Sequence, residues 1–92
     1  MALTITQQDN TITLEGILNA ATVKNFKMHF GYIQNPFRSL TVDFDKVTEM
    51  DASALFTLKE MYRNEALKSN PFFVAGYRSE EIYEDYQFSN IA

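Results

Sequence analysis

The sequence predicts an α/β fold in which a mixed sheet of about four strands packs against about three helices, in the chain order ββαβαβα. Two neighbouring segments near the N-terminus alternate apolar and polar residues, which is typical of paired strands. The rest of the chain alternates helix-like segments with strand-like ones. Such later strands are expected to be parallel and joined by right-handed crossovers. The length of 92 residues predicts a single domain, 1–92.

A β-hairpin and a helix are expected first. Leu3 and Ile5 alternate with threonines, as do Ile12 and Leu14, and the turn-forming residues 8–10 separate the two segments. Asn19 then suits the N-cap of a helix. The apolar positions of this helix recur at helical spacing, and they are Val23, Phe26, Phe30 and Ile33. The Asn-Pro pair at 35–36 is expected to end it.

A third strand is expected over 40–45, where Val42 and Phe44 face the core and alternate with acidic residues. Val47 and Met50 are expected to anchor a following loop. A second helix is predicted from near Asp51 to about Lys68. Its apolar positions are Leu55, Leu58, Met61, Tyr62 and Ala66. The cap of this helix is either Asp51 itself, or Thr48 with Asp51 completing a capping box.

A fourth strand and a third helix complete the expected order. Residues 72–75 form a continuous apolar run, which suits a strand covered on both faces. Ser79 is expected to cap a short helix, with Glu80 and Glu81 in its first turn, where the helix dipole favours acids.

Composition excludes several classes of function. The net charge is −4 and the sequence contains no run of Lys and Arg, so it lacks the basic cluster that is typical of a nucleic-acid-binding protein. For the same reason direct binding to an anionic membrane is disfavoured. The absence of cysteine excludes disulfides and thiolate metal sites and fits a cytoplasmic location. Neither a signal peptide nor a membrane span is expected. The 14% aromatic content supplies core bulk and is compatible with a homodimer.

Asp43 and Asp45 are the first candidates for chemistry. Two carboxylates two residues apart on a strand lie on one side, as a magnesium site requires, and the pattern resembles the nucleophile strand of haloacid-dehalogenase-type phosphatases. That strand normally comes first in a larger core, and later strands supply further acids, which 75–77 do not. A strand whose polar positions are acidic is therefore the favoured interpretation, and a magnesium-dependent phosphatase is a distant alternative.

The lone histidine, His29, is the second candidate. A catalytic histidine needs a nucleophile or an orienting carboxylate, and its sequence neighbours offer neither. We expect His29 to lie at the surface or at the boundary of the core. With one histidine and no cysteine, no metal site or cofactor is expected.

The start of the second helix is the third candidate. Ser53 is expected on its first turn, near free backbone N–H groups. A phosphate on this hydroxyl would be stabilised by those donors and by the helix dipole. It would also add negative charge beside Asp51. The residues alone favour a plain helix start.

Three stretches in order resemble the STAS family, which is named for sulphate transporters and anti-sigma antagonists. Residues 15–22 (EGILNAAT) are similar to the family's Gly-x-Leu-Asp-Ala segment. Residues 40–55 (LTVDFDKVTEMDASAL) resemble its strand, loop and Asp-Ser-Ser/Thr-Gly-Leu signature. Residues 73–76 match an apolar strand that ends near Gly. The resemblance implies a small sheet with helices packed on it, as the residues themselves predict.

The resemblance implies a non-enzymatic, bacterial, cytoplasmic regulator that binds a protein. Soluble members of the family bind an anti-sigma factor with kinase activity, and phosphorylation of the Ser directly after the signature Asp releases them. Other members are small subunits of lipid-transport ABC complexes or modules of stress-signalling assemblies. The expected partner is therefore an anti-sigma factor or kinase-like protein, with an ABC permease as the alternative.

The chain departs from the family pattern at three places. The phosphorylated Ser is replaced by Ala52, and Ser53 occupies the next position, about 100° further round the helix. Asn19 replaces the usual Asp. The chain stops at 91–92, about where family members continue, so a domain without the final strand and helix is expected. Constitutive binding, or control by another route, is predicted unless Ser53 is the phosphate acceptor.

Phe56 stands where the family usually has a small residue. It falls on the flank of the second helix with Glu60 and Arg63, so we expect it to be at least partly exposed and to belong to a docking surface. The alternative is that the preceding loop or the C-terminal end of the chain covers it. The residues expected to bind the partner or regulate its binding are Asp51, Ala52, Ser53, Leu55, Phe56 and Lys59.

Overall fold

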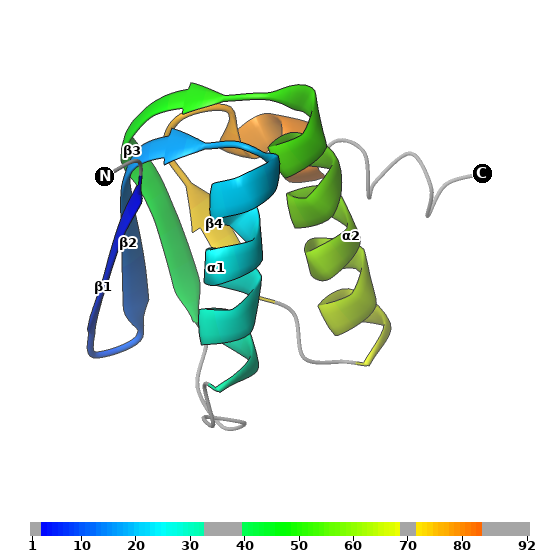
Figure 1. Ribbon diagram of the computed structural model, residues 1–92. Helices are drawn as coiled ribbons and strands as arrows, with labels where there is room; N and C mark the ends of the chain where they lie inside the picture. The colour runs from blue at the N-terminus through cyan, green and yellow to red at the C-terminus, as the bar shows by residue number, and fades with distance from the viewer. Residues whose placement is uncertain (1–2, 33–39, 69–71, 84–92) are drawn as a thin grey trace.

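The computed structural model describes residues 3–32, 40–68 and 72–83. The elements in chain order are β1 (Leu3–Gln8), β2 (Thr11–Leu18), α1 (Ala20–Gly31), β3 (Thr41–Met50), α2 (Ala52–Leu67) and β4 (Phe73–Ala75), and 79–83 are helical. One sheet has the strand order β1-β2-β3-β4, with β1 antiparallel to β2 and the other neighbours parallel (Figure 1). The predicted mixed α/β fold and its order are confirmed.

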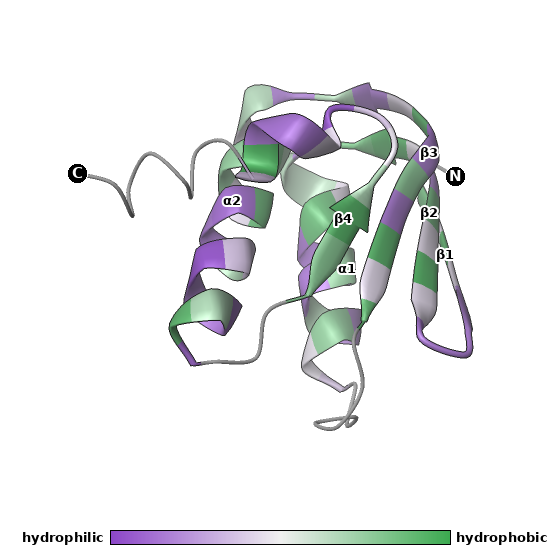
Figure 2. Ribbon diagram, turned by 180° about the vertical axis from the view of Figure 1, so that it is seen from behind, coloured by the Kyte–Doolittle hydropathy of each residue, from purple (hydrophilic) through white to green (hydrophobic). Residues whose placement is uncertain are grey.

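Both long helices cover the same face of the sheet. Figure 1 and Figure 2 show both helices on the same side of the strands, with α1 nearer to them and α2 farther away. Polar and apolar residues alternate along β2 and β3 because only one face of these strands is covered. The largest fully buried side chains are Phe26, Phe44, Ile12, Leu14, Leu18, Leu58, Ile82 and Val42. Along β1, β2 and β3 the opposite face is mainly polar, and most of its residues are threonines and acids.

The third strand is longer than its alternation predicted. Val47 and Met50 lie in β3 and not in a loop, and both are buried. The register of β3 with β2 shifts between Thr13 and Glu15 and again between Gly16 and Ile17. These irregularities break the period of two while pairing continues, so the sequence pattern ends before the strand does.

The fourth strand is covered on one face only, so the expectation of two covered faces is wrong. Val74 is buried, whereas Phe73 is 48% exposed and Ala75 is exposed. The reason is that β4 lies at the edge of a sheet whose helices all pack on one side. Phe72, just before the strand, is buried and makes edge-to-face contacts with Phe30 and Tyr62.

The predicted starts of the two long helices are confirmed. The Asn19 side chain accepts hydrogen bonds from the N–H groups of Ala21 and Thr22, and the Thr22 hydroxyl completes a capping box. The second helix is capped by Asp51 directly, because Thr48 lies in β3.

The third helix begins one residue earlier than expected. Ser79 lies inside the helical residues, where it is buried, instead of preceding them. The predicted positions Ile33, 35–36 and 91–92 lie outside the described residues.

The Tyr83 hydroxyl closes the outer edge of β4. It accepts a hydrogen bond from the Val74 N–H at 2.7 Å and donates one to the Val74 carbonyl at 3.0 Å. Tyr83→Phe should therefore destabilise the fold by about 1–2 kcal/mol, because two backbone groups lose their partner. Urea unfolding measures the loss, and amide exchange at Val74 should accelerate. Unchanged exchange at Val74 would show that this hydroxyl does not protect the edge.

Candidate functional site

The start of α2 is held by the ends of the two central strands. The Asp51 carboxylate accepts a hydrogen bond from the Ala54 N–H at 2.9 Å, and the Asp51 N–H donates to the Leu18 carbonyl at 3.1 Å. The first helical residues, Ala52 and Ser53, are both exposed. The backbone here is therefore fixed by local capping and by a contact with the end of β2, while the adjoining side chains remain accessible.

A shallow hollow of about 460 Å³ separates the first turns of α1 and α2. It is lined by Ala20, Val23, Lys24, Lys27, Ala52, Ser53, Phe56 and Thr57. Its α1 side carries two lysines, and its α2 side carries two hydroxyls and an aromatic ring. We call this feature the lysine hollow. It places Ala52 and Ser53 in one surface with residues of α1, which the sequence did not predict.

The docking residues expected from the sequence occupy different environments. Phe56 is 62% exposed, which confirms the expectation of exposure and excludes its coverage by the preceding loop. Leu55 is buried at 7% exposure, so it packs in the core beneath the surface and does not offer its side chain to a partner. Lys59 is half-buried, and its positive charge contributes to lowering the pKa of Glu81. The start of α2 therefore presents Asp51, Ala52, Ser53 and Phe56 to solvent.

A second hollow, of about 410 Å³, lies next to the cap residue of α2. It is lined by Ile17, Leu18, Asn19, Thr48, Glu49, Met50, Asp51 and Tyr77. Its charged residues are both acidic, Glu49 and Asp51. Residues of the first turns of α2 thus line a surface with two lysines, whereas its cap residue and the end of β3 line a surface with two carboxylates.

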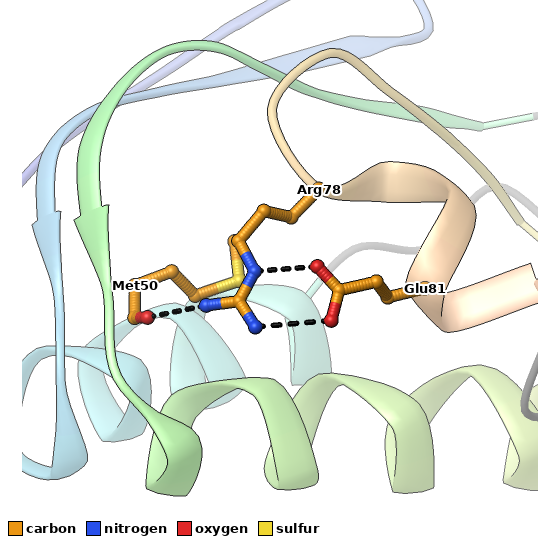
Figure 3. A network of polar contacts seen from close by, with 3 residues as sticks. All are labelled: Met50, Arg78 and Glu81. Atoms are coloured by element: carbon orange, nitrogen blue, oxygen red, sulfur yellow. Dashed lines mark hydrogen bonds and ion pairs between the residues drawn. The ribbon is translucent and has the colours of Figure 1, made fainter.

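Arg78 connects the turn after β4 to the start of α2 (Figure 3). Its guanidinium group donates from Nη1 to the Met50 carbonyl at 2.8 Å. Nε and Nη2 donate to the two carboxylate oxygens of Glu81. Met50 directly precedes the cap residue of α2, so this network fixes the backbone from which the helix begins.

Sequence reasoning missed Arg78. Its bond to Met50 joins residues 28 positions apart, and no local pattern reports such a contact. The available signals were the Arg78 and Glu81 spacing of three, typical of a helical ion pair, and the preceding Gly76. Arg78 itself has a positive φ of 60°, so the turn holds it in a conformation that few non-glycine residues adopt.

The Arg78 network makes part of the stability depend on pH. The hydrogen bonds from Arg78 hold the pKa of Glu81 below its ordinary value of 4.5. A carboxyl group whose pKa is lowered by folding stabilises the fold above its unfolded pKa and ceases to do so as pH falls through its folded pKa. Both side chains are about one-third exposed, so solvent screens the pair.

Glu81→Gln should therefore cost less than about 1 kcal/mol at neutral pH. The difference from wild type should vanish in acid, below the folded pKa of Glu81. Urea unfolding of both proteins at neutral and acidic pH measures it, with the exposed neighbour Glu80→Gln as a control. A difference that persists at acidic pH would contradict the assignment to the ion pair.

The other two candidates lie away from this site. Asp43 and Asp45 are on the uncovered face of the sheet, and the Asp43 carboxylate accepts a hydrogen bond from the Asp45 N–H at 2.9 Å. Within 3–32, 40–68 and 72–83, no group of three or more His, Cys, Asp or Glu side chains is placed to hold a metal ion. His29 is half-buried, with Nε2 3.4 Å from the side-chain oxygen of Gln7 on β1.

Comparison with known proteins identifies one family. The family model described as the STAS domain matches residues 2–82, which is most of the chain. No match was found among curated proteins. None of the described helices combines the length and the apolarity that crossing a lipid bilayer requires.

Proposed function

Because the chain belongs to the STAS domain family, we propose that it is a non-enzymatic regulatory domain of the anti-sigma-antagonist type, which binds a partner protein through the start of α2. The observation that carries the proposal is the accessible surface formed by Ala52, Ser53 and Phe56 on a rigidly held helix start. We place the domain in the cytoplasm, where a soluble kinase-like protein or sigma-regulating factor is available as a partner.

The geometry of the helix start favours recognition over chemistry. Asp51 is engaged in capping, and the exposed side chains around it are a methyl group, a hydroxyl group and an aromatic ring. An exposed aromatic ring beside small residues is a typical anchor of a protein interface. Arg78 and the Leu18 carbonyl hold the backbone in place, which lowers the entropic cost of ordering this surface on binding.

We propose that regulation in this chain differs from the usual phosphoserine switch. Ala52 has no hydroxyl group, so it accepts no phosphate. Ser53 is exposed, but it projects from the helix about 100° away from the Ala52 direction. We therefore propose binding without a phosphorylation switch. Stoichiometric phosphate on Ser53 in protein from the native host, found by mass spectrometry, would overturn this part.

Affinity capture from lysate of the native host, with detergent-solubilised membranes included, tests the proposal. One bait is the wild-type chain and the second is Ala52→Glu, which places a negative charge at the first exposed position of the helix. Asn64→Glu is the matched control, because it adds the same charge on an exposed position of α2 about 18 Å away.

A kinase-like or sigma-regulating protein that wild type and Asn64→Glu retain, and Ala52→Glu loses, supports the proposal. The same protein retained by all three baits would contradict binding through the start of α2. An ABC permease as the main captured protein would replace the antagonist role with that of a cytoplasmic permease subunit.

A further inference from the structure

The lysine hollow is a basic site on an acidic protein. The chain has a net charge of −4, with 12 acidic and 8 basic residues. Yet the charged residues that line the hollow are Lys24 and Lys27, and no carboxylate lies among the lining residues. The charge of the lining residues is therefore opposite in sign to the net charge of the chain, and such a surface attracts negatively charged groups.

Both lysines are available for an external ligand. Each is exposed, and they project from successive turns of α1. In the part of the chain that the structure describes, ion pairs join Lys68 with Glu65 and Arg78 with Glu81, and neither lysine of the hollow takes part in one. A carboxylate that approaches the hollow consequently displaces no ion-pair partner of Lys24 or Lys27 among the residues that the structure describes.

Apolar surface lies beside these charges. Phe56 is 62% exposed at the α2 side of the hollow, and Met28, one helical turn beyond Lys24, is 63% exposed. The lining also includes small or branched apolar side chains, Ala20, Val23 and Ala52. A ligand that fills the hollow therefore needs an apolar side chain as well as negative charge.

We infer that the lysine hollow takes an acidic segment of the partner protein, with carboxylates against Lys24 and Lys27 and an apolar side chain against Phe56. This inference rests on the proposed function and names the chemistry of the partner at the same site. The charge and the apolar lining of the hollow complement a segment that contains both acidic and large apolar residues.

The surroundings of the hollow favour a protein segment over a membrane. Asp51 precedes α2 and Glu60 lies one turn after Phe56, and both are exposed acids. A continuous anionic surface pressed against Phe56 would meet these two carboxylates as well as the lysines. A peptide segment places its charges only where the lysines are.

Selection from a library of random peptides displayed on phage tests the inference. The targets are the wild-type chain and the double variant Lys24→Glu/Lys27→Glu. Lys46→Glu/Lys68→Glu is the matched control, because it makes the same change of net charge at two exposed lysines outside the hollow. Affinities of the recovered peptides are then measured at two salt concentrations.

We expect recovered peptides to combine Asp or Glu with aromatic or large aliphatic residues. They should bind Lys24→Glu/Lys27→Glu roughly tenfold more weakly than wild type and should lose affinity as the salt concentration rises. They should bind Lys46→Glu/Lys68→Glu as tightly as wild type. The inference would be overturned if the recovered peptides were basic or neutral, if they bound both double variants equally, or if no peptide were enriched over background. Stronger binding of wild type to vesicles of phosphatidylcholine and phosphatidylglycerol than to any recovered peptide would also overturn it.

Failure of this inference is distinguishable from failure of the proposed function. A captured partner that is lost with Ala52→Glu but kept with Lys24→Glu/Lys27→Glu supports docking at the start of α2 and rejects the acidic segment. A partner kept by both variants rejects the docking site itself.

Discussion

Gly76→Ala should destabilise the fold by roughly 3 kcal/mol. Gly76 has a φ of +94°, a conformation that L-residues with a side chain rarely adopt. A Cβ atom there would lie 2.5 Å from the Asp45 backbone nitrogen and 2.9 Å from the Phe44 carbonyl carbon. Because these are backbone atoms of the central strand β3, the clash cannot be relieved by rotating a side chain.

Urea unfolding measures this effect, and Gly31→Ala is the matched control. Gly31 is the last residue of α1, and a Cβ atom there would meet nothing within 4 Å among the described residues outside its chain neighbours and the backbone of its own helix. The control should unfold near the wild-type midpoint. If the two variants unfolded at the same urea concentration, the close approach of the turn after β4 to β3 would be refuted.

Phe56→Ala should weaken partner binding by about 2 kcal/mol, which is roughly thirtyfold in Kd. The ring is 62% exposed, so its removal leaves the core intact and the free energy of unfolding nearly unchanged. The loss of affinity then reports the contact with the partner alone. Titration calorimetry with the purified partner measures the difference.

Leu67→Ala is the control for this substitution. Leu67 is also a large apolar residue of α2, 72% exposed, and it lies at the opposite end of the helix. The Leu67→Ala variant should bind the partner as tightly as wild type. Equal losses in both variants would indicate contact along the whole exposed face of α2, and no loss in Phe56→Ala would remove the aromatic anchor from the proposal.

The elements that the sequence predicted well have strong local signals. Ile12 and Leu14 alternate with polar residues because β2 is covered on one face, and Asn19 and Asp51 cap helices through their own side chains. Each of these features depends on residues within four positions, so the linear sequence records it. The exposure of Phe56 followed from its place on the helix in the same way.

The features that sequence reasoning missed depend on distant residues. β3 continues to Met50 because it pairs with β2 through two register shifts, which alternation does not reveal. Arg78 binds a carbonyl 28 positions away. The lysine hollow exists because α1 and α2 lie side by side, which brings Lys24 near Ser53 although 29 positions (53 − 24) separate them. None of these contacts leaves a periodic pattern.

Hydrogen–deuterium exchange of the chain, free and in complex with its captured partner, tests most directly whether the partner binds at the start of α2, as we propose. We expect slower exchange in the complex at residues 20–27 and 51–57, which line and flank the lysine hollow. Slower exchange confined to the uncovered face of the sheet, with 51–57 unchanged, would contradict binding at the start of α2.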